Sequence, residues 1–370
     1  MKIAATLVTI VVTAVLVPAA PASSEVVVPD GFTLGLVTDR LTKPIDIAFT
    51  PDGRLFVVEQ EGRVRIVQPD GSLLTFLDIS AKVDSTDERG LSSIAFDPAF
   101  ATTGRVFLDY TREATTTVPA HNRVVRVTAN GNTAVPGSEK LIFRLPNQDD
   151  THHHGGSMAF GADGKLYITT GDNVGGSSHL LSNLLGKVLR INKSGTIPST
   201  NPFYRTLLNK HRAIWAAGLR NPFKIAEDPG ANRIYINDVG DAAWEEIDRG
   251  VAGANYGWRL YEGPETDPAY TDPLFAYGHD GDAATTGCSI TGGAFSRGSA
   301  FPSGFNGDYF FADFCNGWIR SYDIGTGVAS GFLTGASSIV DVAFGPDGRM
   351  YYVSRGAARA APIWAVDHPA

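Results

Sequence analysis

The sequence of 370 residues contains no basic stripe and no arginine-rich arm, and its 39 acidic side chains outnumber 31 basic ones. This charge balance argues against nucleic acid or an anionic membrane surface as a partner. Beyond the N-terminal segment, no stretch approaches about 20 uncharged apolar residues, which argues against an integral membrane segment in the mature chain. The mild acidic excess suits an exported, soluble, calcium-binding protein, but it identifies no partner.

The N-terminal segment has the features of a secretory signal peptide. Met1 and Lys2 give a short basic start, and a nearly unbroken apolar run follows to Val17. Ala20-Pro-Ala22 then fits the small-x-small cleavage pattern. We expect residues 1–22 to be removed and the mature chain to be secreted or periplasmic. An uncleaved membrane anchor is the alternative.

Cysteine is nearly absent, since the chain contains only Cys288 and Cys315. In an oxidising compartment, such a pair is expected to form one disulfide. Two buried free thiols or an intermolecular bridge are the alternatives.

Amphipathic helices and low-complexity linkers are also missing. Without helices alternating with the strands, an α/β sheet is not expected. Without a linker, residues 23–370 are expected to fold as one domain. Instead, one phrase recurs six times: an apolar strand, a tight turn that often contains Asp-Gly, and a second apolar strand. Its copies begin at Ile45, Leu91, Ser157, Asn221, Thr291 and Val340.

The repeated phrase predicts an all-β, six-bladed β-propeller. Glycine supplies the positive φ that the tight reversal between two strands needs. A sheet of three or four strands cannot bury both faces alone, so neighbouring sheets stack around an axis and cover each other.

The most distinctive polar segment is Asp149-Asp-Thr-His-His-His-Gly-Gly156, just before the third copy of the phrase. Loops in this position gather at one mouth of a propeller channel. The following hairpin would bring Asp172 back beside His153. A carboxylate on one imidazole nitrogen fixes the tautomer and raises the basicity of the other, as a general base requires. A surface histidine cluster with a turn-capping aspartate is the alternative.

A metal pair at His152 and His154 is a different interpretation, because residues two apart share one face of a strand. A third ligand with zinc-like spacing is missing from the segment. Other histidines that could contribute are His179, His211 and His279.

Two further segments carry ligand-binding groups. Arg220 and Asn221 can present a planar cation and an amide to a carboxylate-rich ligand. A structural arginine that binds loop carbonyls is the alternative. Downstream, residues 238–248 contain closely spaced carboxylates, and residues 253–258 form a Gly-rich turn. Such oxygen donors suit a hard cation such as calcium, although a solvated acidic loop would look similar.

Together these residues make the chain resemble the glucose/sorbosone dehydrogenase family. That family includes soluble sugar dehydrogenases that depend on pyrroloquinoline quinone (PQQ). The resemblance spans residues 31–367. The segments that carry it are His153 to Asp172, Gly186 to Ile191, Asn201 to Phe203, Gly218 to Pro222 and Asn255 to Trp258.

The resemblance implies an oxidation of an aldose sugar or related alcohol to a lactone. His153 would take a proton from the anomeric hydroxyl while a hydride passes to the quinone, and Asp172 would orient His153. Arg220 and Asn221 match residues that contact the quinone. An external electron acceptor would reoxidise the cofactor.

The resemblance also implies two calcium sites. Backbone carbonyls at the Gly240-Asp241 turn would hold the ion at the cofactor. The carboxylate of Glu246 and the backbone of Tyr256 would hold a second ion.

The chain departs from the family at several cationic positions. Members that use the quinone carry a lysine where Cys315 stands and two arginines in the segment Ser338 to Val340. Three expected cations are therefore missing, which reduces the charge compensation for a tricarboxylate quinone. The other differing positions are Val239, where a glutamine is expected, and the sugar-contacting positions Glu88 and His152.

These departures leave two hypotheses. The first is an exported PQQ-dependent sugar dehydrogenase. The second is a non-catalytic, calcium-stabilised extracellular propeller that binds a glycan or a protein, as in the branch resembling the Hedgehog-interacting protein. The Cys288–Cys315 pair and the Trp-Glu-Glu-Ile motif at Trp244 to Ile247 favour that branch.

Overall fold

The computed structural model describes residues 25–228, 230–296, 300–356 and 360–369. The expected signal peptide therefore lies outside the described residues. Within them, no helix has the length and apolar character needed to cross a membrane.

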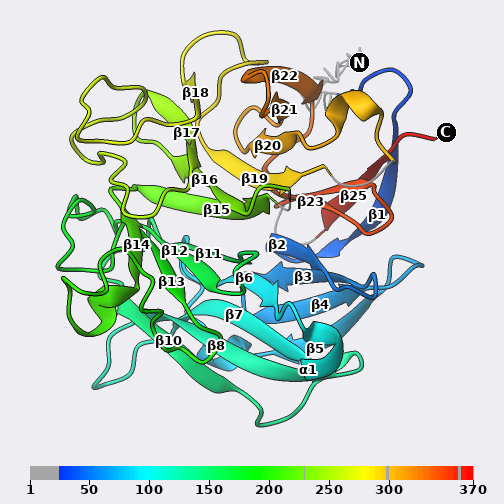
Figure 1. The fold of residues 1–370 in the computed structure, drawn as a ribbon. Coiled ribbons are helices and arrows are strands. Elements are labelled where there is room, and N and C mark those ends of the chain that lie inside the picture. Colours follow the sequence, from blue (N-terminus) through cyan, green and yellow to red (C-terminus); the bar gives the residue numbers. More distant parts are fainter. Residues whose placement is uncertain (1–24, 229, 297–299, 357–359, 370) are drawn as a thin grey trace, which may run out of the picture.

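Six sheets stand around a common axis as the blades of a β-propeller, which confirms the predicted fold (Figure 1). Five blades are built from strands that follow one another in sequence. Blade 1 contains β2 (Pro44–Phe49), β3 (Leu55–Glu59), β4 (Arg63–Val67) and β5 (Leu73–Asp78). Blade 2 contains β6 (Leu91–Phe96), β7 (Arg105–Arg112), β8 (His121–Asn130) and β10 (Lys140–Asn147), with the short β9 (Thr133–Ala134) paired to β8. Blade 3 contains β11 (Gly155–Phe160), β12 (Leu166–Thr170), β13 (Lys187–Ile191) and β14 (Ile214–Ala217).

The remaining blades follow the same plan. Blade 4 contains β15 (Asn221–Asp228), β16 (Arg233–Val239), β17 (Trp244–Arg249) and β18 (Phe275–Gly278). Blade 5 contains β19 (Ile290–Phe295), β20 (Tyr309–Asp313), β21 (Ile319–Asp323) and β22 (Val328–Leu333). Blade 6 contains β23 (Ile339–Phe344), β24 (Met350–Ser354), β25 (Ala361–Asp367) and β1 (Thr33–Leu41). Helical structure among the described residues is limited to α1 (Phe100–Thr103) and three 3-10 turns, Ser80–Lys82, Asn209–Ala213 and Ser303–Phe305.

The first strands of the blades form the inner ring, because each contacts the first strand of the next blade. Their hairpins turn as the sequence predicts. In blade 1, Gly53 has φ +88°, and its N–H donates to the carbonyl of Thr50. Gly164 and Gly348 close the corresponding turns of blades 3 and 6 in the same way. Because each hairpin is antiparallel, the loop before its first strand and the loop after its second strand lie at the same end of the blade.

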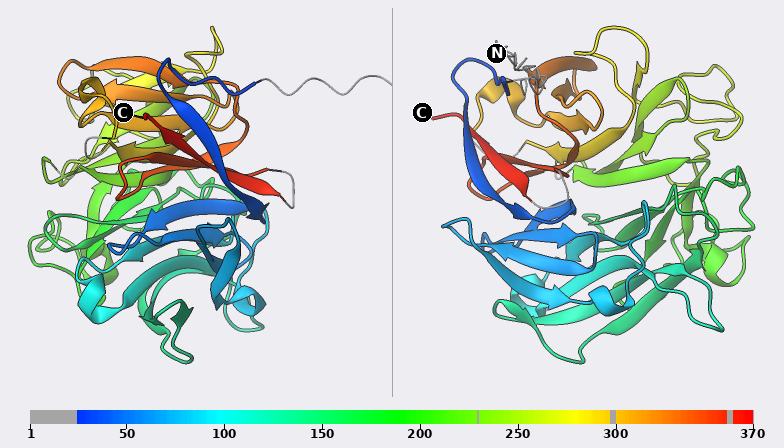
Figure 2. Two further views of the ribbon diagram at one scale, coloured as in Figure 1. Left: turned by 90° about the vertical axis from the view of Figure 1, so that its right-hand side faces the viewer. Right: turned by 180° about the vertical axis from the view of Figure 1, so that it is seen from behind.

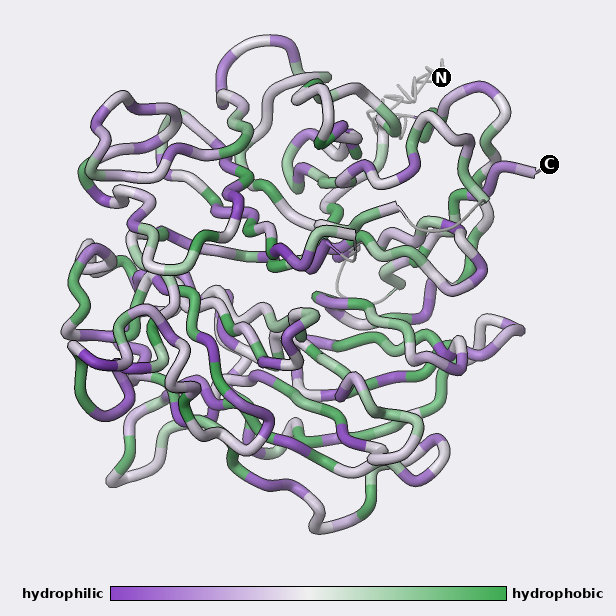
Figure 3. Tube along the Cα trace, in the orientation of Figure 1, coloured by the Kyte–Doolittle hydropathy of each residue, from purple (hydrophilic) through white to green (hydrophobic). Residues whose placement is uncertain are grey.

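The hydrophobic core is divided into six clusters, each between two neighbouring blades. Successive residues of a strand point to opposite faces of its sheet. Phe56 therefore packs toward blade 2, whereas the next residue, Val57, packs toward blade 6. The same alternation occurs in the other second strands, at Phe107 and Leu108, Tyr167 and Ile168, Tyr235 and Ile236, Phe310 and Phe311, and Tyr352 and Val353. Figure 3 shows apolar positions along the strands and hydrophilic stretches in many of the connecting loops.

Two features of the fold were not evident from the repeats. Strand β1 is the outer strand of the last blade and pairs antiparallel with β25, so both ends of the chain close the ring (Figure 2). Strand β18 lies between the fourth and fifth copies of the repeated phrase, in a segment that the pattern does not cover, and it completes blade 4. Both strands are outermost and lack the Asp-Gly hairpin that identifies the inner pairs.

Candidate active site

His153 and Asp172 lie in contact, as the hairpin spacing predicts. Nδ1 of His153 is 2.8 Å from Oδ1 of Asp172. The approach depends on Gly171, because a Cβ at that position would lie 1.9 Å from the carbonyl oxygen of His153. With Nδ1 held by a carboxylate, the neutral imidazole carries its proton there and exposes the Nε2 lone pair. His153 lines a cavity, so Nε2 is available to a ligand in that cavity.

Asp172 is fixed by more than the histidine. Trp258 Nε1 donates to Oδ2 at 2.8 Å, and the backbone N–H of Val174 donates to Oδ1 at 2.8 Å. Burial opposes ionisation of Asp172, but the hydrogen bonds from His153 and Trp258 hold the pKa of its carboxyl below the ordinary value. An ionised Asp172 can therefore orient the imidazole and stabilise it when it becomes protonated.

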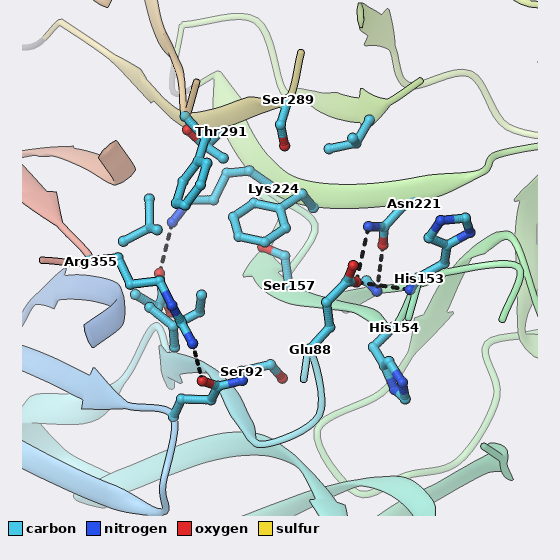
Figure 4. Close-up of a pocket in the computed structure, with 18 of the residues that line it drawn as sticks. Glu88, Ser92, His153, His154, Ser157, Asn221, Lys224, Ser289, Thr291 and Arg355 are labelled. Atoms are coloured by element: carbon cyan, nitrogen blue, oxygen red, sulfur yellow. Dashed lines mark hydrogen bonds and ion pairs between the residues drawn. The ribbon is translucent and has the colours of Figure 1, made fainter. Parts of the chain in front are cut away.

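Asn221 and Glu88 position the same loop. The backbone N–H of His153 donates to Oε2 of Glu88 at 2.8 Å, and Nδ2 of Asn221 reaches the same oxygen at 3.3 Å. Oδ1 of Asn221 accepts from the backbone N–H of Gly155 at 3.0 Å. Figure 4 shows Glu88, His153 and Asn221 together on one side of the pocket.

Arg220 lies beside this group and also borders the cavity. Its guanidinium donates to the carbonyl of Val239 at 3.0 Å and to Oδ1 of Asp241 at 2.9 Å, and it sits 5.5 Å from the centre of the Trp258 ring. Arg220 and Asn221, the residues expected to contact the quinone, therefore both lie at the pocket. Trp258, which links Arg220 to Asp172, was not identified as a contact of the pair by sequence reasoning.

The cavity has a volume of about 460 Å³ and lies at the mouth of the inner ring. Glu88, His153 and Asn221 line one side, and Arg355 lies on the other side (Figure 4). Lys224 also contributes to the wall. Sequence reasoning singled out neither Lys224 nor Arg355.

Lys224 is held between two buried carboxylates. Its ammonium is 2.8 Å from Oδ1 of Asp46 and 2.7 Å from Oδ1 of Asp341. Burial alone would lower the pKa of Lys224, but the two carboxylates raise it above the ordinary value. The positive charge of Lys224 is therefore already compensated by Asp46 and Asp341.

Cys288 and Cys315 form a disulfide, so the intramolecular bridge expected from export is present in the structure. Cys288 borders the cavity. Val239 and Val340 line it as well, so the glutamine position and one of the missing cation positions contribute apolar wall instead.

The metal-pair interpretation of His152 and His154 gains no support. His152 is exposed, and its Nδ1 pairs with Asp150. His154 is buried, and burial lowers the pKa of its imidazole to about 4. Among the described residues, the group of three potential metal ligands is elsewhere, at Asp238, Glu246 and Asp248.

Asp238, Glu246 and Asp248 form a buried carboxylate cluster, with one oxygen of each within 4.8 Å of the others. Asp238 is paired directly with Glu246 in the β16/β17 ladder, and Asp248 follows on the same face of β17. Burial raises the pKa of Glu246 to about 7 and the pKa of Asp248 well above its ordinary value. Neither carboxylate oxygen of Asp248 has a hydrogen-bond partner within the described part of the chain.

This cluster contains one predicted calcium ligand, Glu246, and adds Asp238 and Asp248. The i, i+2 spacing of Glu246 and Asp248 is the signal that could have identified the pair. Tyr256, whose backbone is the other predicted ligand, is buried, and its hydroxyl donates at 2.9 Å to the carbonyl of Arg249, the residue after Asp248. Carboxylate oxygens are the donors that Ca²⁺ prefers, and in this buried cluster both oxygens of Asp248 are unpartnered among the described residues.

The turn predicted to hold calcium at the cofactor borders the cavity. Gly240 and Asp241 both contribute to its wall. Four successive backbone N–H groups, from Asp241 to Trp244, donate to Oε1 of Glu262 at 2.7 to 3.2 Å. Glu262 therefore fixes the turn without occupying its carbonyl oxygens, and these remain candidates for a cation.

Comparisons with known proteins identify the family whose sequence this chain matches. A sequence model of the family described as Glucose / Sorbosone dehydrogenase matches residues 41–360. HIPL2 protein from Arabidopsis thaliana is 31% identical over 310 residues, which cover 64% of this chain and 44% of that protein. Aldose sugar dehydrogenase YliI from Escherichia coli is 28% identical over 235 residues, which cover 63% of each chain.

A solved structure has the same architecture. The putative oxidoreductase (glucose dehydrogenase) from Thermus thermophilus superposes with a TM-score of 0.79 at 26% identity, covering 91% of this chain and 100% of that chain. The present chain spans less than half the length of HIPL2 protein. The sequence similarity to HIPL2 protein therefore covers only part of that protein.

Proposed function

Because the chain belongs to the glucose/sorbosone dehydrogenase family, we propose that it is an exported oxidoreductase that uses PQQ to oxidise an aldose sugar or related alcohol to a lactone. The observation that carries the proposal is the His153–Asp172 pair at the cavity wall, next to Arg220 and Asn221. This arrangement combines a general base with a site for an anionic ligand.

The residues present fit the cofactor. A volume of about 460 Å³ falls within the usual range of small-molecule sites. Arg220 and Asn221 supply a cation and an amide on the His153 side, and Arg355 supplies a cation on the other side. When bound, the quinone supplies the acceptor for the hydride, and an external electron acceptor reoxidises it.

The chain's own groups perform the proton chemistry. Nε2 of His153 accepts the proton of the sugar's anomeric hydroxyl, which makes departure of the hydride from the same carbon favourable. Asp172 keeps the proton of the neutral ring on Nδ1 and stabilises the imidazolium that forms. Glu88, which accepts from the backbone N–H of His153, also lines the cavity, where it would accept hydrogen bonds from the sugar hydroxyls.

We further propose calcium at two places. Backbone carbonyls of Gly240 and Asp241 would hold one ion at the cavity, where it orients the cofactor. Asp238, Glu246 and Asp248, with the backbone of Tyr256, would hold the other behind Arg220 and Asn221. The backbone N–H groups of Arg220 and Asn221 donate to Asp238 at 2.8 and 2.7 Å, so this ion would stabilise the segment that binds the cofactor.

The direct test is His153→Ala in purified protein reconstituted with PQQ and calcium. Dye-linked oxidation of aldoses should be lost, because no other group occupies the position of Nε2. The matched control is His179→Ala, which removes an exposed imidazole that does not line the cavity and should keep activity. Wild-type activity in His153→Ala would refute the assignment.

A non-catalytic propeller that binds a glycan or a protein is the second candidate. The observation that favours it is the replacement of expected cations by the disulfide-bonded Cys315 and the apolar Val340. Titration of the apo-protein with PQQ in the presence of calcium separates the two. An absorbance shift at micromolar quinone supports the dehydrogenase, whereas no binding supports the second candidate.

A further inference from the structure

Arg355 is a pocket cation without a carboxylate partner among the described residues. It directly follows β24, and its backbone N–H donates to the carbonyl of Ser338 across the hairpin at 2.8 Å. Its guanidinium donates to Oε1 of Gln60, a neutral acceptor. The side chain lines the cavity and is half-buried.

The two other pocket cations are neutralised by carboxylates. Lys224 lies between Asp46 and Asp341, and Arg220 is paired with Asp241 at 2.9 Å. A half-buried guanidinium that lacks such a partner loses hydration without gaining an opposite charge. Burial accordingly lowers the pKa of Arg355. The charge at Arg355 is therefore available to an anion that enters the cavity.

Arg355 lies where the proposed cofactor requires a cation. Ser338 and Val340 stand where quinone-using relatives are expected to carry arginines, and Arg355 faces Ser338 from the neighbouring strand. Figure 4 shows its side chain on the side of the pocket opposite Glu88 and His153. A ligand that spans the cavity would meet Arg220 and Asn221 at one end and Arg355 at the other.

We propose that Arg355 binds a carboxylate of the quinone, and so replaces from the facing strand a cation that is missing from the segment Ser338 to Val340. This inference rests on the proposed function, because the quinone is the ligand it names. A guanidinium–carboxylate pair formed inside the cavity would join two ionised groups, so it would be stronger than the hydrogen bond to the neutral Gln60.

A purely structural role for Arg355 makes different predictions. Gln60 donates from Nε2 to the carbonyls of Asp87 and Arg89, both at 2.7 Å, so Arg355 could serve to hold Gln60 and that loop. In that case, removing the guanidinium would destabilise the ligand-free protein. If Arg355 serves a ligand, removing its uncompensated charge leaves the ligand-free protein at least as stable.

The experiment is a titration of calcium-loaded protein with PQQ, followed by the absorbance of the cofactor, together with the thermal midpoint of each ligand-free variant. Arg355→Gln should raise Kd about tenfold or more. Arg355→Lys, which keeps the charge, should raise it less. The control Arg349→Gln removes a cation from the opposite end of the same strand, where it pairs with Asp347, and should leave Kd unchanged.

The outcomes separate the two proposals. If the wild type binds the quinone and Arg355→Gln binds it equally well, the Arg355 inference is wrong and the proposed function stands. If the wild type does not bind the quinone, both fail. If Arg355→Gln and Arg355→Lys are equally weak and both lower the ligand-free thermal midpoint, Arg355 supports the fold through Gln60, and the inference is overturned.

Discussion

At the scale of single residues, the proposed chemistry depends on which nitrogen of His153 carries the proton. Asp172 settles this by accepting from Nδ1, while Trp258 and Val174 keep the carboxylate in place. An asparagine at position 172 could offer its amide N–H to Nδ1 and so move the ring proton to Nε2.

We therefore expect Asp172→Asn to lower kcat by about 100-fold or more, since the tautomer with a basic Nε2 would no longer be favoured. Quinone binding should change little, because Asp172 does not line the cavity. Steady-state kinetics with an aldose and a quinone titration of the same variant test this prediction. A kcat within threefold of the wild type would contradict the role given to Asp172.

His154 should make stability depend on pH. Its side chain is 3% exposed, and burial lowers the pKa of the imidazole from 6.5 to about 4. Between these values the unfolded chain binds a proton that the folded chain does not, so stability falls as the pH falls through 6.5. At pH 5 the loss relative to pH 7.5 is about 2 kcal/mol.

His154→Phe should remove this contribution, and urea unfolding at pH 7.5 and 5 measures it. His152→Gln is the control of opposite sign. A hydrogen bond to Asp150 raises the pKa of His152, so its contribution is present at acid pH and is lost as the pH rises. Equal acid sensitivity of His154→Phe and the wild type would contradict this account of His154.

At the scale of elements, the β16/β17 ladder gathers three carboxylates that should repel one another without a cation. Removing calcium with a chelator should lower the thermal midpoint by a few degrees, as expected for loss of an ion present at about 100 times its Kd. Asp248→Asn should remove the part of that sensitivity that comes from this cluster. Calorimetry with and without calcium measures both effects.

The same variant also tests the alternative, in which no calcium binds at the carboxylate cluster. Without a metal, Asp248 is a buried carboxyl with no partner among the described residues, so Asp248→Asn would raise stability whether or not calcium is added. The exposed Asp280→Asn serves as a control for loss of one negative charge. A stabilised Asp248→Asn protein with no calcium response in the wild type would exclude the cluster as a calcium site.

Sequence reasoning succeeded where the relevant contacts are local. A two-stranded hairpin returns to its start, so the spacing of His153 and Asp172 was enough to place them together. Sequence reasoning did not identify contacts whose partner comes from a distant part of the chain. Examples are the hydrogen bond of Trp258 to Asp172 and that of Arg355 to Gln60. These contacts depend on loop paths, which the repeat pattern does not specify.

At the scale of the whole molecule, the number of blades followed from the six repeated hairpins, but the closure of the ring did not. Strand β1 contains exposed polar residues and has no hairpin partner nearby in sequence, so only the packed fold reveals its pairing with β25. The contacts at the centre of the ring could not be predicted from the sequence either. Lys224 appears in the sequence as an ordinary strand residue, although its partners come from two distant blades.

Lys224 and its two carboxylate partners join blades that do not follow one another in sequence. Lys224 belongs to blade 4, Asp46 to blade 1 and Asp341 to blade 6. Asp46 also accepts from the backbone N–H of Ile94 in blade 2, and Asp341 from that of Ile47 in blade 1. Lys224 lines both the cavity of the site and a second cavity of about 810 Å³, so it stands between the two.

Lys224→Met should therefore destabilise the propeller by about 3 to 5 kcal/mol, because it leaves two buried carboxylates without their cation. The triple variant Lys224→Met, Asp46→Asn, Asp341→Asn should recover much of this loss, since asparagine oxygens can still accept from Ile94 and Ile47. Because the carboxylates raise the pKa of Lys224, the stabilisation is present at neutral pH and is lost only as the pH rises through that raised value. Urea unfolding of both variants at pH 7.5 measures these free energies. If Lys224→Met were as stable as the wild type, the charged triad would not hold the blades together.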